Sequence, residues 1–210
     1  MGKSPDLELL HTRDYQVQSF RTTGDNLLIR GAVRDSKPPN LYWPTDPEIM
    51  VIHHMIVELD VTFGSMVITG ARVIFETHPH QQCPAIIDHY QQLVGVSIAR
   101  GYTHKVRELF GGPRGCSHTT ALLQAMAPVA MQSGFSMRSA QLNDGSYVAP
   151  GENTGSKSLL APINTCHVWS EDGDLAEQSR TGQFVEVPIP MARRLKELGV
   201  DPIEFRRRGR

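Results

Sequence analysis

The chain has 210 residues, a formal net charge of −1 and a hydrophobic fraction of 40%. Such values are typical of one globular domain, which we expect to span residues 1–210. The near-neutral charge argues against a nucleic-acid surface, and no apolar run reaches the roughly 18–20 residues that cross a bilayer. The first residues carry no apolar signal segment, so we expect a cytoplasmic protein without nucleic-acid or membrane partners.

The first third of the chain (1–80) predicts β structure, because polar and apolar residues alternate and short glycine-containing turns separate the runs. The expected strands cover residues 15–20, 27–35, 52–62 and 66–77. Short connections favour an antiparallel meander, with a proline-rich loop between the second and third strands. One face of this sheet should be apolar, and the other should carry Glu58, Asp60 and Arg72.

The pattern changes to helical spacing in residues 81–135. Helices are expected at 84–94, 103–110 and 119–133, a long loop at 136–158, a β-hairpin around Glu171–Asp174 within 159–187, and a short helix at 191–198. The sequence therefore predicts an α+β fold: an antiparallel β meander, then a helical segment packed on one face, and a C-terminal β-hairpin.

The segment Gly115-Cys116-Ser117-His118 is the most informative motif, because it places a thiol and an imidazole where a loop becomes a helix. Reactive or metal-binding thiols occur at helix N-termini. Cys116 and His118 are therefore candidates for nucleophile, base or ligand. The structural alternative is a buried cysteine beside a histidine that caps the helix.

Three further groups combine charged or ionisable side chains at short spacing. In the expected strand, His53 and His54 face opposite sides, so only one of them can enter a given pocket. Asp35 and Lys37 flank Ser36 and would project to one side, as a pair that orients a substrate or as a surface ion pair. His11 and Arg13 have the same spacing.

A metal site is an alternative use of the cysteines. The count of three, without an export signal, favours free or metal-bound thiols over disulfides. Cys83, Cys116, Cys166 and His118 could together hold zinc, and a second option combines the histidines at 78–80 with Cys83. No cysteine knuckle, dinucleotide fingerprint, phosphate loop or serine-nucleophile elbow is present, so we expect no cofactor.

Several short motifs together resemble a bacterial family described as domain of unknown function 2889. They are His11-Thr12-Arg13, Asp35-Ser36-Lys37-Pro38, Ile52-His53-His54-Met55, Cys83, Leu93-Val94-Gly95 and Gly115-Cys116-Ser117-His118. The resemblance covers about residues 8–170 and favours functional roles for His53 and for the pairs His11/Arg13 and Asp35/Lys37. An aspartate usually stands in that family where His54 lies here.

Members of that family tend to come from bacteria that degrade aromatic or steroid compounds. The resemblance thus implies a catabolic enzyme for a small aromatic (lignin-derived) or polycyclic substrate. We expect acid/base chemistry, with a lyase ahead of a hydrolase: His53 and His118 would move protons, Cys116 would be a nucleophile or oriented thiol, and Lys37 and Arg13 would bind an acidic group. The alternatives are a zinc- or iron-binding hydrolase or metallo-regulatory protein, and a non-catalytic ligand-binding subunit. Homo-oligomerisation stays open.

Overall fold

The computed structural model describes residues 6–147, 162–181, 183 and 186–207. The sequence predicted one domain, and the structure divides the chain into two compact units, Met1–Gly134 and Phe135–Arg210. Each unit is described here by itself.

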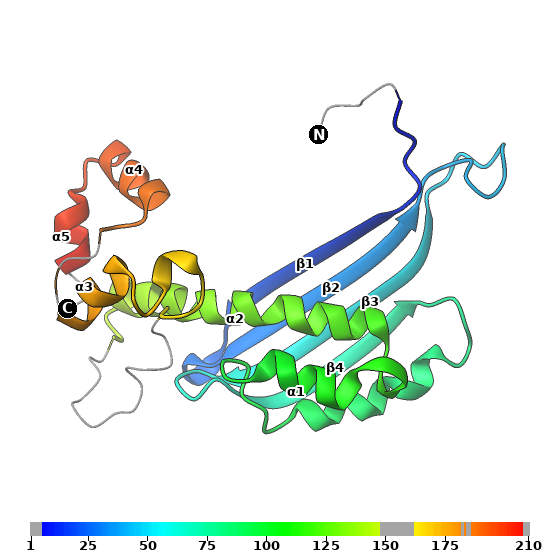
Figure 1. Cartoon of the computed structure of the whole chain (residues 1–210), viewed down its shortest axis with the longest axis horizontal. Coiled ribbons are helices and arrows are strands. Elements are labelled where there is room, and N and C mark those ends of the chain that lie inside the picture. Colours follow the sequence, from blue (N-terminus) through cyan, green and yellow to red (C-terminus); the bar gives the residue numbers. More distant parts are fainter. Residues whose placement is uncertain (1–5, 148–161, 182, 184–185, 208–210) are drawn as a thin grey trace. The chain divides into compact units, whose positions relative to one another are not determined.

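The first unit is built on a four-stranded antiparallel sheet with the strands in chain order (Figure 1). The strands are β1 (Thr12–Arg21), β2 (Leu27–Lys37), β3 (Met50–Thr62) and β4 (Val67–Thr77). The predicted meander is therefore confirmed, with longer strands than the alternation indicated. A short helical turn, η1 (Thr23–Asp25), joins β1 to β2 through Gly24, whose φ of 68° suits glycine.

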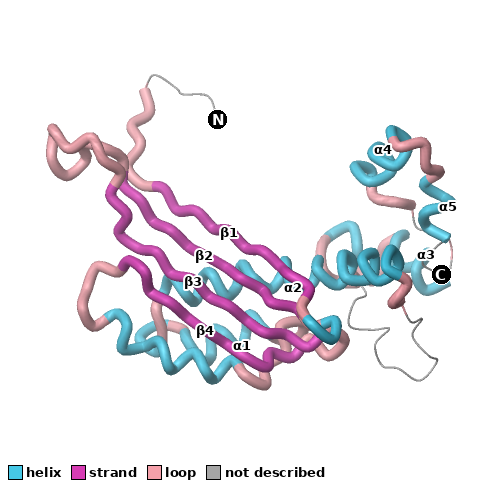
Figure 2. Tube along the Cα trace, turned by 180° about the vertical axis from the view of Figure 1, so that it is seen from behind, coloured by secondary structure: helices cyan, strands magenta, loops and turns pink. Residues whose placement is uncertain are grey.

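Helices cover one face of the sheet and leave the other face open (Figures 1 and 2). They are the 3-10 helix η2 (Cys83–Leu93), α1 (Tyr102–Phe110), the turn η3 (Gly112–Arg114) and α2 (Ser117–Asp144). The contact with α2 is close, since a Cβ on Gly31 of β2 would lie 2.9 Å from the Met126 sulfur. The core between sheet and helices includes Ile29, Val33 and Leu122, all fully buried.

The open face of the sheet carries Glu58, Asp60 and Arg72, as the sequence predicted. Glu58 on β3 has Arg30 of β2 and Arg72 of β4 as its register neighbours on either side. Arg30 donates to Glu58 across 2.7 Å, and Arg72 also pairs with this carboxylate. The Glu58 carboxylate is thus neutralised by two arginines from adjacent strands.

The second unit is helical where it is described. After the end of α2 come η5 (His167–Trp169), α3 (Asp174–Thr181), α4 (Ile189–Glu197) and α5 (Pro202–Arg207). None of the described helices in either unit is long and apolar enough to cross a membrane.

Two predictions for this part of the chain were wrong. The loop expected at 136–158 begins later, because α2 continues to Asp144 and buries Met137; residues 148–161 lie outside the described residues. The expected hairpin around Glu171–Asp174 is replaced by a turn and α3, which begins at Asp174. Acidic residues in the first turn and an Arg180–Glu177 ion pair favour this helix. The α+β fold class itself is confirmed.

Candidate active site

Three adjacent strands place Arg13, Asp35 and His53 in one row across the sheet. Arg13 of β1 is the register partner of Asp35 on β2, and Asp35 is also the partner of His53 on β3. The register shifts immediately beyond this row, since Ser36 pairs with Val51 and Ile52 is left as the extra residue of a bulge. Bulges redirect neighbouring side chains, and this one adjoins the row that faces α2.

Asp35 is the centre of the cluster, since Arg13 and three histidines contact its carboxylate, and it is only 1% exposed. The Arg13 guanidinium donates to both carboxylate oxygens, from Nε to Oδ1 at 2.6 Å and from Nη2 to Oδ2 at 2.7 Å. This hydrogen-bonded cation lowers the pKa of Asp35 to about 2, although burial alone would raise it. The same pairing raises the pKa of Arg13. Asp35 is therefore a fixed negative charge at neutral pH.

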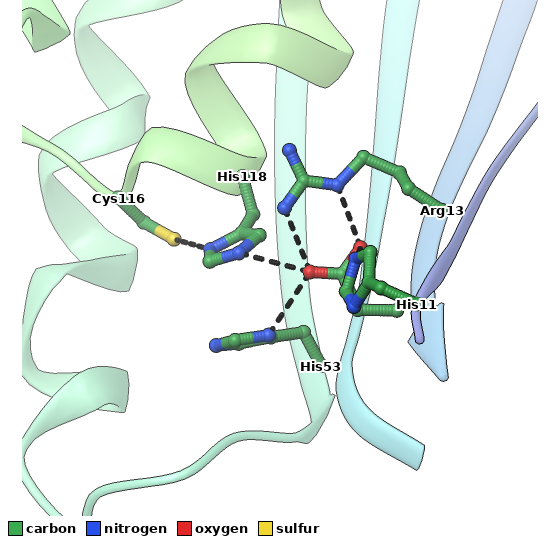
Figure 3. Close-up of polar contacts among 6 residues, drawn as sticks. His11, Arg13, His53, Cys116 and His118 are labelled. Carbon is green, nitrogen blue, oxygen red and sulfur yellow. Dashed lines mark hydrogen bonds and ion pairs between the residues drawn. The ribbon is translucent and has the colours of Figure 1, made fainter. Parts of the chain in front are cut away.

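Two imidazoles share one oxygen of this carboxylate. His53 Nδ1 and His118 Nε2 each lie 3.1 Å from Asp35 Oδ2, and the two rings stack with centroids 3.7 Å apart. An ionised carboxylate only accepts hydrogen bonds, so both of these nitrogens carry a hydrogen. The neutral rings then keep their lone pairs on His53 Nε2 and His118 Nδ1. Figure 3 shows both free nitrogens pointing away from the carboxylate, to the side where Cys116 lies.

The pKa of each histidine is lowered, above all because burial disfavours the charged ring. For His118 the charge of His53 and then that of Arg13 lower the pKa further, and Asp35 opposes them. The two stacked rings therefore resist being positively charged at the same time. At neutral pH each ring of the pair has a nitrogen that can accept a proton. Once the pair has taken up a single proton, the charged ring can act as an acid and the neutral ring as a base.

The start of α2 holds His118 and Cys116 in place. Thr120 N–H donates to the Cys116 carbonyl at 2.9 Å as the helix begins, and Cys116 N–H donates to the buried Tyr90 hydroxyl at 2.8 Å. Gly115 has no room for a side chain, because a Cβ there would lie 2.6 Å from the Phe110 carbonyl oxygen. The Cys116 sulfur lies 3.6 Å from His118 Nδ1.

The other candidate residues differ in whether they contact Asp35. His11 Nε2 lies 3.6 Å from Asp35 Oδ1, at the edge of the cluster. The side chain of Lys37, half-buried at the end of β2, makes no hydrogen bond or ion pair with any described residue. The ion-pair partner of Asp35 is Arg13 and not Lys37, because cross-strand register outweighs the i, i+2 spacing. His54 faces the opposite side of β3 from His53 and pairs with Glu76 at 2.9 Å.

The cysteines remain thiols. Cys83 begins η2 and is half-buried, and Cys166 is exposed in the second unit. Within the described chain, the one trio of potential ligand residues whose donor atoms lie within 4.8 Å of one another is Asp35, His53 and His118. That trio includes none of the three cysteines. Arg13 already occupies both Asp35 oxygens, and the imidazole nitrogens nearest the carboxylate carry hydrogen, so the arrangement suits hydrogen bonding.

Sequence reasoning missed Tyr90 and the central position of Asp35. Tyr90 is completely buried, and its hydroxyl accepts the N–H of Cys116. In the sequence it had only the helical spacing of a core residue. A signal for Asp35 was present, since it is an acidic residue near the end of a strand whose preceding positions on the same face are apolar.

Residues 11–132 match the sequence profile of the family described as Protein of unknown function (DUF2889), so the chain belongs to that family. The matched region contains every residue of the Asp35 cluster. A search of curated proteins found no match, and a search of solved structures found none either.

Proposed function

We propose that the protein is a cytoplasmic, cofactor-independent lyase that cleaves a carbon–carbon bond or eliminates a group from a small aromatic or polycyclic compound. One observation carries the acid/base part of this proposal: two stacked imidazoles each place a nitrogen 3.1 Å from the same oxygen of a buried, arginine-paired carboxylate. This arrangement fixes which nitrogens are basic, and because the ring pKa values are lowered, these nitrogens are free to accept a proton near neutral pH.

The proposed reaction uses the one-proton state of the pair. The neutral ring takes a proton from the substrate, the released electron pair forms a double bond, and the leaving group departs with the proton of the other ring. After the reaction one ring is again charged and the other neutral, so no external acid, base or redox reagent is consumed. We assign proton abstraction to His53 Nε2 and protonation of the leaving group to His118 Nδ1, the nitrogen that also lies near Cys116. Asp35 stabilises whichever ring is charged.

The substrate class has separate support in the surface around the cluster. The end of the sheet that carries the Asp35–His53 row also carries the N-terminal segment and the β2–β3 loop (Figure 1). Large apolar side chains are exposed on both, among them Leu10 at 57%, Tyr42 at 60% and Trp43 at 68%. Exposed apolar groups gathered beside a polar site are typical of a surface that binds an apolar molecule.

The test is a screen of aromatic and polycyclic catabolites, with products identified by mass spectrometry, followed by two variants that separate base from scaffold. His53→Asn keeps an N–H near the Nδ1 position and His118→Gln keeps one near the Nε2 position, so each can still donate to Asp35. Each removes the free basic nitrogen, and we expect kcat to fall by roughly 10²–10⁴-fold. His54→Asn is the matched control, since His54 faces the other side of β3, and it should leave turnover within about twofold. Full turnover in the double variant at His53 and His118 would refute the proposal.

A metal-binding function is the second candidate, favoured by the closeness of Asp35, His53 and His118. Zinc or iron bound there would have to displace hydrogen from the ring nitrogens or use Nε2 of His53 after the ring rotates. Metal content per chain, measured on protein purified without chelator, decides between the two. Near-stoichiometric metal that is lost in His53→Asn would support this candidate, and sub-stoichiometric metal unaffected by the variants would oppose it.

A further inference from the structure

The proposed acid/base reaction does not use the Cys116 thiol. Its sulfur lies 3.6 Å from Nδ1 of His118, and Nε2 of the same ring lies 3.1 Å from Asp35 Oδ2. A thiol, an imidazole and a carboxylate are therefore connected through the two nitrogens of one ring (Figure 3). A nucleophile in contact with a base that a third group orients is the structural signature of covalent catalysis.

The direction of the proton transfer follows from the carboxylate. Asp35 is ionised and accepts a hydrogen bond from His118 Nε2–H, so the lone pair of the neutral ring is on Nδ1, opposite the sulfur. The thiol is thus the donor and His118 the acceptor in their contact. The backbone is fixed too, because Cys116 N–H bonds the Tyr90 hydroxyl and Gly115 packs against Phe110. These contacts fix the Cys116 backbone, so only rotation about the Cα–Cβ bond can move the sulfur away from His118.

We propose that Cys116 is a nucleophile for carbon electrophiles, specifically for the β-carbon of an alkene conjugated to a carbonyl group. In this step His118 Nδ1 takes the thiol proton and the sulfur forms a bond to the β-carbon. The alkene electron pair moves onto the α-carbon and carbonyl, which then receive the proton back from His118. The product is a thioether, all atoms are accounted for, and no co-reactant is needed. This inference rests on the proposed site and adds a covalent group to it.

The chain contains its own reference thiols for a test. Cys166 is exposed and Cys83 is half-buried, and within the described residues neither of these two sulfur atoms makes a hydrogen bond to a histidine ring. The probe is N-ethylmaleimide, an alkene conjugated to two carbonyls, applied to the full chain at pH 7. Peptide mass spectrometry then gives the alkylation rate of each cysteine separately. We expect Cys116 to react at least tenfold faster than Cys166, although Cys166 is the more exposed. An equal or slower rate at Cys116 would overturn the proposal.

Variants connect the reactivity to the ring. His118→Gln should slow alkylation of Cys116 at least tenfold and leave Cys166 unchanged, and the half-buried Cys83 of the same unit should keep its rate if the variant remains folded. His54→Gln, on the opposite face of β3, should leave both rates within about twofold. An unchanged Cys116 rate in His118→Gln would show that the imidazole does not activate the thiol. The comparison in the wild-type chain needs no variant, so it decides even where His118→Gln fails to fold.

Failure of this inference is distinguishable from failure of the proposed function. Slow alkylation of Cys116 together with a large loss of turnover in His53→Asn would refute the role of Cys116 as a nucleophile and support the acid/base pair. Fast, His118-dependent alkylation together with full turnover in the double histidine variant does the reverse. Cys116→Ser adds a direct reading, because a covalent adduct of the true substrate, seen as a mass increase on the intact chain, should be absent in this variant.

Discussion

The two faces of the sheet each bury a carboxylate between adjacent strands, and only one of them has the chemistry of an active site. On the open face Glu58 is paired by Arg30 and Arg72, and on the helical face Asp35 is paired by Arg13 and contacted by His53 and His118. Both are well buried, at 8% and 1% exposure.

The difference lies in what the partners can do with a proton. Arginine stays charged at any working pH, so the Glu58 cluster has one protonation state and acts as an electrostatic clamp between strands. Histidine changes its charge near neutral pH, so the Asp35 cluster has at least two. A buried charge therefore indicates a site only when its neighbours can exchange protons. The comparison between the faces can be tested with matched variants.

The largest expected difference comes from neutralising each carboxylate in turn. Asp35→Asn removes the acceptor that fixes both ring tautomers, and we expect turnover to fall by roughly 10²–10⁴-fold. Glu58→Gln should leave turnover within a few-fold, although it too separates a buried ion pair. Steady-state kinetics on the substrate found in the screen measures both. Equal losses in the two variants would mean that Asp35 acts only through stability.

The acid limb of the activity is the next expected effect. Because the pKa values of His53 and His118 are lowered and the reaction needs one charged and one neutral ring, kcat/KM should reach its maximum below pH 6.5, the ordinary histidine value, and fall once both rings are protonated at more acidic pH. A pH–rate profile between pH 4 and 8 measures this. Glu58→Gln should have the wild-type profile, and an acid limb centred above pH 6.5 would contradict the lowered values.

Stability should also depend on pH through Asp35. Its pKa is 3.8 in the unfolded reference and about 2 in the folded chain, so the carboxylate contributes stability above pH 3.8 that is lost as pH falls through 2. This shift corresponds to about 2 kcal/mol, of which roughly half is lost by pH 3. Urea unfolding of wild type and Asp35→Asn at pH 7 and pH 3 measures the contribution. A gap between the two proteins that does not narrow at pH 3 would contradict the assignment.

The smallest expected effect is on substrate binding at the apolar end of the sheet. Trp43→Ala should raise KM by roughly threefold to tenfold with little change in kcat, as expected from the loss of about 0.5–1.5 kcal/mol of aromatic contact. Phe20→Ala is the matched control, because Phe20 is an exposed aromatic residue at the other end of β1, where it lies near Arg30. An equal effect of both variants would indicate a general loss of stability.

The sequence was informative wherever the determinants were local. Alternating apolar residues predicted the four strands, and Gly115-Cys116-Ser117-His118 predicted the position at which α2 begins. Spacing along the chain could not find the partner of Asp35, because Arg13 reaches it through a strand register that depends on distant residues. The helical extension of α2 past Gly134 was missed for a related reason, since burial of Met137 outweighs a glycine that usually ends helices.

β1 lies at the edge of the sheet, and this position affects the fraction of time for which the site is fully assembled. β1 has a hydrogen-bonded neighbour on one side only, so its local opening costs less free energy than opening of β2 or β3. Each such opening withdraws Arg13 and His11 from Asp35 together, and for that interval the carboxylate loses its strongest counter-charge. The fraction of molecules that are ready to react should therefore follow the amide hydrogen-exchange protection of β1, even under conditions in which the rest of the sheet stays closed.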